Sequence, residues 1–425
     1  MHDGQATNLG NLIGSDADLE KTAFIEVTPD GESGRFTHRE IDALSADFGA
    51  ALQVAGYRPG ESIALLARNS VAYFVAYLGI MRAGLVAVPV SYRQPLEMIA
   101  HCFRDSAVKL VLTDDVVPLP DFEAPVIRIG ADMADAIAGH AAERRLVPFA
   151  NAPRDVAMVL YTSGSTGKPK GVELSHESQL FALSVFEPQR PVISRHVLSV
   201  AAPLYHMNAL SLSKLTVLMN ATAVLFTDFD AERVIRAIPT YGISWLTGIP
   251  TMYALMAERP EILDGTDLSS VTKITLGSSP LTDNLLSRLQ RSFPDATYNN
   301  SYGTTEHGPS AFAPHPAGLP LPQLSVGCTA PGVETRLVGG PDVDLGVLEV
   351  RSPANLNGYR NLPEVTADRL RDGWYHTGDV FRRDENGFHF FVGREDDMFV
   401  CNGENVHPVD VERLLEQHPA IRQAC

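Results

Sequence analysis

The chain has 425 residues, of which 45% are apolar and 20% are charged, and its 51 acidic and 34 basic side chains give a formal net charge of −17. This length predicts two or three structural units, and the composition is typical of a globular protein with a substantial core. The acidic balance argues against a nucleic-acid partner. A nucleotide ligand stays open, because backbone N–H groups can hold phosphate on an acidic protein.

Cysteine usage and apolar runs indicate the compartment. The four cysteines lie far apart without a CxxC pair, at Cys102, Cys328, Cys401 and Cys425. They predict neither a disulfide framework nor a zinc site and favour the reducing cytoplasm. Residues 1–20 lack the basic start and apolar core of a signal peptide. The most apolar stretch, residues 71–90, has Arg82 in its middle and Gly84 as a helix stop, so it predicts a buried helix and strand rather than a membrane span.

Helical and strand periods alternate along the first 300 residues. Thr37 and Glu40 form a candidate capping box, after which an apolar face recurs at helical spacing until Gly56. Strands are predicted at 62–67, 108–113, 157–161, 197–201, 221–226 and 243–246, and helices at 231–238 and 282–293. This alternation predicts parallel sheets covered by helices. From about residue 314 proline and glycine become dense and short strands at 334–338 and 346–351 predict a small β unit, before a last helix at 408–415.

The run YTSGSTGKPKG, residues 161–171, follows a strand-like segment and is glycine-rich. It is not a Walker A loop, because Gly164 and Gly167 are too close together for that motif. Glycines let phosphate approach the backbone N–H groups, and Lys168 and Lys170 add positive charge. Further hydroxyl donors come from Thr162, Ser163, Ser165 and Thr166. We therefore interpret the run as a phosphate-binding loop rather than a flexible linker.

This loop resembles the signature loop of the adenylate-forming superfamily, which contains acyl- and aryl-CoA synthetases, nonribosomal-peptide adenylation domains and luciferases. Three further stretches resemble the superfamily's motifs in the same order: NSYGTTE at 300–306, GWYHTGD at 373–379, and GREDD at 393–397 followed by NGEN at 402–405. The stretches NSYGTTE and GENVHPVDVE, the latter at 403–412, most resemble aryl-CoA ligases of the halobenzoate type, with medium-chain acyl-CoA synthetases close behind. Four motifs in order make a chance match improbable.

The resemblance implies an α/β fold with two interleaved, mostly parallel sheet subdomains and a small β-barrel-like subdomain, as in the large N-terminal domain of these enzymes. We expect a first α/β subdomain with the phosphate loop at 1–175 and a second with an acyl pocket at 176–315. A small β subdomain would follow at 316–395, and a hinge with the start of a further domain at 396–425.

The resemblance also implies ATP and Mg²⁺ as ligands. A carboxylate attacks the α-phosphorus of ATP, giving an acyl-adenylate and pyrophosphate, so positioning and charge stabilisation carry the catalysis. Thr305 would bond the α-phosphate and Glu306 would hold Mg²⁺. The β- and γ-phosphates would contact Thr162, Ser163, Gly164, Ser165, Thr166, Gly167, Lys168 and Lys170.

The adenosine part has its own implied residues. Tyr302 would stack on adenine with Asn300 nearby, a structural core tyrosine being the alternative. Asp379 would accept both ribose hydroxyls, because a carboxylate offers two acceptors to a cis-diol, and Arg394 would reach the same ribose. Asp396 matches the hinge about which the C-terminal domain rotates. The remaining positions implied at the nucleotide are Gly277, Ser278, Ser279, Ser301, Gly303 and Thr304.

Three segments, 204–207, 247–249 and 276–279, resemble the superfamily's acyl pocket. His206, also a candidate catalytic residue with Thr305 and Glu306, stands where amino-acid-activating relatives have an aspartate, which disfavours an α-amino acid; a buried, satisfied histidine is the alternative. The segments contain no Arg or Lys, which argues against a dicarboxylate such as malonate, and apolar Leu210 suggests an uncharged tail, aromatic or medium-chain. The implied substrate-binding residues are Tyr205, His206, Met207, Thr247, Gly248, Ile249 and Leu276.

The second half-reaction transfers the acyl group to a thiol, normally that of coenzyme A. In the superfamily it needs a C-terminal domain that carries a catalytic lysine, and a complete domain would need on the order of a hundred residues. Since only a short stretch follows Asp396, we expect a truncated form that binds nucleotide but turns over poorly. Two alternatives stay open: loading of a carrier-protein phosphopantetheine, or a non-catalytic binding fragment. The sequence does not name the acid or the oligomeric state, for which a homodimer is one option.

Overall fold

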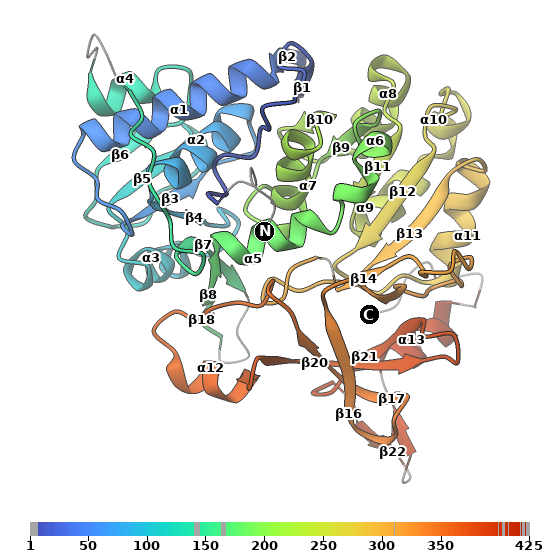
Figure 1. The fold of residues 1–425 in the computed structure, drawn as a ribbon. Coiled ribbons are helices and arrows are strands. Elements are labelled where there is room, and N and C mark those ends of the chain that lie inside the picture. Colours follow the sequence, from blue (N-terminus) through green and yellow to red (C-terminus); the bar gives the residue numbers. More distant parts are fainter. Residues whose placement is uncertain are drawn as a thin grey trace. The chain divides into compact units, whose positions relative to one another are not determined.

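The computed structural model describes residues 7–139, 145–162, 167–309, 311–397, 399–401, 404–406, 408–416, 418 and 421. Its internal contacts divide the chain into two compact units. Unit 1 comprises Met1–Phe229 and Leu356–Thr366, and unit 2 comprises Asp230–Asn355 and Ala367–Cys425. Figure 1 gives the labels of the helices and strands. The four stretches expected from the sequence have other boundaries, and that division stays a prediction.

The larger sheet of unit 1 has the strand order β18-β8-β7-β4-β3-β5-β6. Its strands are β3 (Ser62–Leu66), β4 (Val86–Pro89), β5 (Leu110–Thr113), β6 (Val126–Arg128), β7 (Val156–Thr162), β8 (Lys170–Ser175) and β18 (Gly358–Tyr359). The pairs from β6 to β7 are parallel, whereas β8 is antiparallel to both β7 and β18. Every residue of β3, β4 and β5 is buried, as expected for the central strands of a sheet that is covered on both faces.

A second group of strands in unit 1 has the order β9-β10-β1-β2. Its members are β1 (Thr22–Thr28), β2 (Gly31–Thr37), β9 (Val197–Val200) and β10 (Thr222–Phe226). The β1–β2 pair is an antiparallel hairpin, and the other two pairs are parallel. The sequence prediction missed this hairpin, although Asp30 and Gly31 form a typical turn pair and Gly31 has φ = 112°.

The helices of unit 1 confirm two local predictions. They are α1 (His38–Val54), α2 (Val71–Arg82), α3 (Leu96–Asp105), α4 (Met133–Ala138), α5 (His176–Ser184), α6 (Arg190–Ile193) and α7 (Met207–Leu218), with a 3₁₀ turn at Glu187–Gln189. Both halves of the capping box at Thr37 and Glu40 are present. Helix α2 is buried along almost its whole length, and Arg82 within it pairs with Asp42 at 2.5 Å. Among the described residues, no helix is long and apolar enough to cross a membrane.

Unit 2 begins with three parallel strands in the order β13-β12-β11. They are β11 (Trp245–Gly248), β12 (Lys273–Gly277) and β13 (Thr297–Ser301). The accompanying helices are α8 (Ala231–Tyr241), α9 (Pro250–Ala257), α10 (Pro260–Asp264) and α11 (Asp283–Ser292). The predicted helices at 231–238 and 282–293 are therefore confirmed, within a few residues at their ends.

The rest of unit 2 is mainly antiparallel; the change of texture near residue 314 predicted a small β unit, without the direction of its strands. A five-stranded sheet contains β16 (Glu334–Asp342), β17 (Leu345–Arg351), β19 (Leu370–Arg371), β20 (Trp374–Arg383) and β21 (His389–Arg394). Shorter elements are β14 (Phe312–Ala313), β15 (Cys328–Thr329), β22 (Phe399–Cys401), β23 (Glu404–Val406) and α13 (Pro408–Glu416). Helix α12 (Pro363–Arg369) begins within the residues of unit 1 and ends within those of unit 2. The chain is thus a mixed α/β protein with parallel sheets and a smaller antiparallel β region.

Candidate functional site

The carboxyl ends of the three parallel strands of unit 2 bring several predicted positions together. The register pairs Gly248 with Leu276, Leu276 with Asn300, and Gly277 with Ser301. The ends of β11, β12 and β13 therefore lie side by side at one sheet edge. That edge is where α/β folds place their ligands, because the loops that leave it are free to vary without disturbing the core. Thr247 and Ile249 flank the end of β11 at the same edge.

The turn after β12 has a constrained backbone. A Cβ atom on Gly277 would lie 2.7 Å from the Ser301 carbonyl oxygen, so only glycine lets these strand ends approach. The next residue, Ser278, has φ = 68°, a left-handed conformation that costs a non-glycine residue about 1–3 kcal/mol. Ser278 and Ser279 are both exposed beyond the strand end. Strain of this kind, held beside exposed hydroxyls, is typical of binding sites.

The segment after β13 forms a close turn. Asn300 Nδ2 donates to the Leu324 carbonyl at 2.9 Å, which fixes the strand end. A Cβ on Gly303 would lie 2.6 Å from the Gly308 carbonyl oxygen, so this position also requires glycine. Thr304 forms an isolated bridge with Gly308 across the turn.

Thr305 and Glu306 occupy this turn, between the two bridge residues. Both are partly buried rather than fully solvated. Among the described residues no three His, Cys, Asp or Glu side chains gather as a metal cluster. Glu306 as a ligand of Mg²⁺ stays a prediction.

Tyr302, Asp379 and Arg394 meet in unit 2, although Tyr302 and Arg394 are 92 positions apart in the sequence. The Tyr302 hydroxyl donates to Asp379 Oδ2 at 2.5 Å, and Arg394 Nη1 donates to Asp379 Oδ1 at 2.9 Å. Strand pairing places Asp379 on β20 directly opposite Arg394 on β21. Each carboxylate oxygen of Asp379 therefore accepts one hydrogen bond from the protein. Because the side chain is only 7% exposed, these oxygens have few contacts with water.

The protonation states follow from this geometry. Burial raises the pKa of Asp379, and the hydrogen bond from Tyr302 and the charge of Arg394 partly offset the rise. Burial and the adjacent carboxylate raise the pKa of Tyr302 well above its usual value, so its hydroxyl is neutral and donates. A carboxylate oxygen can accept two hydrogen bonds, so each Asp379 oxygen keeps one acceptor direction for a ligand hydroxyl.

Asp396, the predicted hinge residue, binds the same guanidinium. Arg394 Nε donates to Asp396 Oδ1 at 3.1 Å, and Nη2 lies 3.5 Å from Oδ2. Although burial opposes the charge, Asp396 and Asp379 together raise the pKa of Arg394 further above its usual value. The hydrogen bond from Arg394 in turn lowers the pKa of Asp396.

Tyr302 also has aromatic neighbours that the sequence did not reveal. Its ring centroid lies 4.8 Å from that of Phe381, 5.5 Å from that of His307 and 5.9 Å from that of Phe312. His307 is fully buried, and neither ring nitrogen has a hydrogen-bond partner among the described residues. Burial lowers the pKa of His307 to about 4, so the ring is neutral. Tyr302 is therefore held in place by packing as well as by Asp379, and its stacking on adenine stays a prediction.

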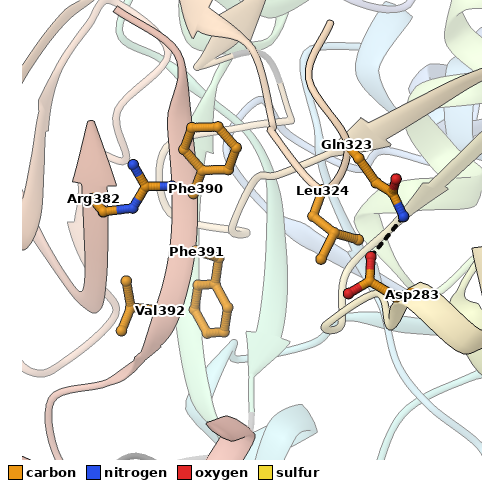
Figure 2. Close-up of a pocket in the computed structure, with 7 residues that line it drawn as sticks. All are labelled: Asp283, Gln323, Leu324, Arg382, Phe390, Phe391 and Val392. Atoms are coloured by element: carbon orange, nitrogen blue, oxygen red, sulfur yellow. Dashed lines mark hydrogen bonds between the residues drawn. The ribbon is translucent and has the colours of Figure 1, made fainter. Parts of the chain in front are cut away.

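A cavity of about 540 Å³ lies beside Phe391, whose ring packs against Phe381, a neighbour of Tyr302. Figure 2 shows Phe390, Phe391, Val392 and Arg382 on one side and Leu324, Gln323 and Asp283 on the other, with Gln323 bonded to Asp283. Phe391 packs edge-on against Phe381, 5.7 Å between centroids, and Phe381 contacts Tyr302. No sequence motif pointed to these residues, because they are single letters at the start of α11, on β20 and β21, and in the loop at 323–324.

In unit 1, the glycine-rich loop joins the two strands of an antiparallel hairpin. Thr162 at the end of β7 pairs with Lys170 at the start of β8, so the strand pairing fixes both ends of the loop. Gly167 has φ = 81°, Lys168 is exposed, and Lys170 Nζ lies 5.9 Å from the Tyr359 ring centroid. The loop residues Ser163, Gly164, Ser165 and Thr166 lie outside the described residues.

Unit 1 also contains the first acyl-pocket segment, at the start of α7. His206 is the N-cap residue of this helix, and its ring centroid lies 4.7 Å from that of Tyr205, which packs edge-on against Tyr92. The His206 side chain is exposed to solvent, although the surrounding protein and the charge of Arg93 lower its pKa. It is therefore not the buried histidine of the alternative interpretation, whereas Met207 is buried.

The comparisons with known proteins agree with this arrangement. The family model described as "AMP-binding enzyme" matches residues 15–360. A feruloyl-CoA synthase from an Amycolatopsis species is 32% identical over 401 residues, which cover 92% of this chain and 79% of the relative. The fatty acid–[acyl-carrier-protein] ligase ScoC of Streptomyces coeruleorubidus is 30% identical, with the same shares covered.

Solved structures support the same assignment. ATP-bound MatB from Rhodopseudomonas palustris superposes with a TM-score of 0.84 at 25% identity, covering 98% of this chain and 84% of that one. The o-succinylbenzoate CoA synthetase of Bacillus subtilis, bound to its acyl-adenylate, gives a TM-score of 0.80 over 95% and 81%; at 24% identity it supports the fold alone. The chain therefore belongs to the AMP-binding enzyme family, as its motifs predicted, and is a ligase of the adenylate-forming, acyl-CoA synthetase type.

Proposed function

We propose that the chain binds ATP with Mg²⁺ and a carboxylic acid with an aromatic or medium-chain tail, and joins them into an acyl-adenylate. A carboxylate oxygen of the acid forms a bond to the α-phosphorus, the bond from that phosphorus to the bridging oxygen breaks, and pyrophosphate leaves. A thiol, that of coenzyme A, then attacks the acyl carbon and AMP leaves. The feruloyl-CoA synthase relative supports the aromatic choice, and the long-chain-fatty-acid–CoA ligase relative from Escherichia coli supports an aliphatic tail.

The observation that carries this proposal is the buried carboxylate of Asp379 between Tyr302 and Arg394. Two fixed donors hold it in one orientation, and its free acceptor directions match the two adjacent hydroxyls of a ribose. Because displacement at phosphorus needs little covalent help from the protein, the task of these residues is to fix the adenosine so that the α-phosphorus meets the acid.

The residues nearer the reacting atoms would complete this arrangement. Thr305 would donate to the α-phosphate, Glu306 would hold Mg²⁺ against the phosphates, and the loop ending at Lys168 and Lys170 would bind the β- and γ-phosphates. Mg²⁺ would supply neutralisation of phosphate charge. His206 at the start of α7 would stand beside the acid as a neutral donor, consistent with its lowered pKa.

Binding measurements test this proposal directly. Calorimetry with ATP–Mg²⁺, with AMP and with acyl-sulfamoyl adenosines, which mimic an acyl-adenylate and cannot react, should show the mimics binding more tightly than AMP, since they fill both the nucleotide and acyl sites. A benzoyl, a cinnamoyl and an octanoyl mimic would rank the tail classes. Absence of nucleotide binding, or acyl mimics no tighter than AMP, would refute the proposal.

A carrier protein is the second candidate thiol, because the ScoC relative is an acyl-carrier-protein ligase. Coenzyme A and a phosphopantetheinylated carrier protein, offered together with ATP and the best acid, separate the two by mass spectrometry. A thioester found only on the carrier protein would replace coenzyme A in the proposal.

A further inference from the structure

Helix α7, which starts at the candidate acyl pocket, contains a lysine that the sequence prediction did not consider. Lys214 is 1% exposed, and its Nζ donates to Gln179 Oε1 of helix α5 at 2.8 Å. Among the described residues, the side-chain amide of Gln179 is the one polar group that hydrogen-bonds to Lys214, and no carboxylate forms an ion pair with it. Buried lysines are normally paired with a carboxylate, because an unpaired charge in the interior is costly. Burial accordingly lowers the pKa of Lys214 to about 7.

Three further buried polar atoms on α5 and α7 have no partner within the described part of the chain. They are Nε2 of Gln179, Oγ of Ser213 and Oδ1 of Asn208. Each such buried group costs free energy that an apolar residue of the same size would not. A hydrogen bond that only linked α5 to α7 would need one donor and one acceptor, which Lys214 and Gln179 already supply. The surplus of unsatisfied groups instead indicates a place where a polar ligand atom completes the set.

Helix geometry relates these groups to the acyl pocket. Met207 and Lys214 are seven residues apart, two turns of α7, and therefore lie on the same face of the helix, with Leu210 between them. His206 and Ser213 share the same relation. The separation along the helix axis is about 10 Å at 1.5 Å per residue. Lys214 thus lies two turns along α7 from Met207 of the candidate acyl-pocket segment, on the same face of the helix as apolar Leu210.

We propose that Lys214 selects the acid: its amine binds an oxygen acceptor at the far end of the acyl tail, about two helical turns from the carboxylate that is activated. This rests on the function proposed above and narrows its substrate to acids whose tail is apolar in the middle and ends in a hydroxyl or carboxylate oxygen. Gln179 holds the amine in place, and its free Nε2 is a second donor to the same oxygen. The absence of Arg and Lys from the three candidate acyl-pocket segments is compatible with this proposal, because the amine of Lys214 lies outside those segments, further along α7.

Matched pairs of acyl-sulfamoyl adenosines test the proposal by calorimetry on the whole chain. One pair is cinnamoyl and 4-hydroxycinnamoyl; the other is octanoyl and 8-hydroxyoctanoyl, so an aryl and an aliphatic oxygen are distinguished. We expect the hydroxylated member of at least one pair to bind about tenfold more tightly. Lys214→Met should abolish that preference while leaving the affinity for AMP unchanged. A wild-type chain without preference in either pair, or a Lys214→Met variant that keeps it, overturns the proposal.

Two further variants test whether the preference depends on Lys214 in particular. Lys273 on β12 is also a partly buried lysine with a lowered pKa, but its Nζ lies 3.7 Å from the ring centroid of Trp245 on β11. Lys273→Met should therefore keep the preference, and its loss there as well would contradict the proposal. If Lys214→Met does not fold, Gln179→Met supplies the test: loss of the second donor, and of the contact that holds the amine, should reduce the preference, and a preference that is unchanged or larger overturns the proposal. Failure of AMP itself to bind refutes the underlying function instead, and the selection with it.

Discussion

Substitution of Asp379 by asparagine tests the ribose contact most directly. The change keeps the shape of the side chain but removes the charge and replaces one acceptor oxygen with a donor. Since the Tyr302 hydroxyl and Arg394 both point donors at this carboxylate, one of them loses its acceptor whichever way the amide turns. The ribose hydroxyls lose charge-assisted hydrogen bonds at a side chain that is only 7% exposed.

The magnitude follows from the number of bonds. Two hydrogen bonds to a buried charge are worth together about 3 kcal/mol, which corresponds to a roughly 150-fold weaker affinity for AMP. The stability cost should be smaller, about 1 kcal/mol, because Arg394 is 38% exposed and keeps its bonds to Asp396. We therefore expect a folded variant in which loss of nucleotide binding is the main defect.

Calorimetry with AMP and with 2′,3′-dideoxy-AMP, each on the wild type and on Asp379→Asn, forms a complete cycle. The wild type should lose about as much affinity on removal of the two hydroxyls as the variant loses for AMP, and the variant should hardly distinguish the two ligands. Asp396→Asn is the matched control, since it removes an exposed carboxylate from the same guanidinium and should weaken both ligands equally and by only a few-fold. Equal weakening of both ligands by Asp379→Asn would refute the assignment of the ribose to this residue.

Three further predictions concern stability and the strand edge. His307 is neutral with a pKa of about 4, below its unfolded value of about 6.5, so it contributes stability that is lost as the pH falls from about 6.5 to 4; His307→Phe should flatten that part of the denaturation profile, and an unchanged slope would contradict it. Gly277→Ala would place a methyl group 2.7 Å from the Ser301 carbonyl oxygen and should abolish AMP binding, whereas retained affinity would show that the strand edge adapts. Thr37→Ala removes the capping box with Glu40 and should cost about 1 kcal/mol in chemical denaturation without changing AMP affinity.

The sequence was sufficient wherever a local rule decides the structure. The capping box at Thr37, the buried helix that contains Arg82, and the strand–helix alternation all follow from spacing and composition, and all are found. The motif order also predicted the family. In each case the signal lies within a few residues of the feature that it predicts, so no tertiary information is needed.

What the sequence did not reveal depends on contacts between distant segments. Nothing in the letters around Tyr302 says that its hydroxyl meets a carboxylate 77 residues later, because that pairing is set by how the strands stack. His307 and Lys214 are single polar letters inside apolar or motif-rich stretches, and their burial depends on helices and rings far along the chain. The β1–β2 hairpin is a different case, since the residue pair Asp30–Gly31 is itself a local turn signal from which the hairpin could have been predicted.

The guanidinium shared between two carboxylates makes two events thermodynamically dependent on one another. Arg394 divides its donors between Asp379, which faces the candidate ribose site, and Asp396, which is exposed at the predicted pivot. Any state of the chain that draws Asp396 away leaves more of the guanidinium to Asp379 and changes the affinity for adenosine. If adenosine binds Asp379 as proposed, linkage requires that it shift the equilibrium between the Asp396-bound and Asp396-free states of Arg394 by the same factor. The size of that coupling would be read as the difference in AMP affinity between the wild type and Asp396→Asn.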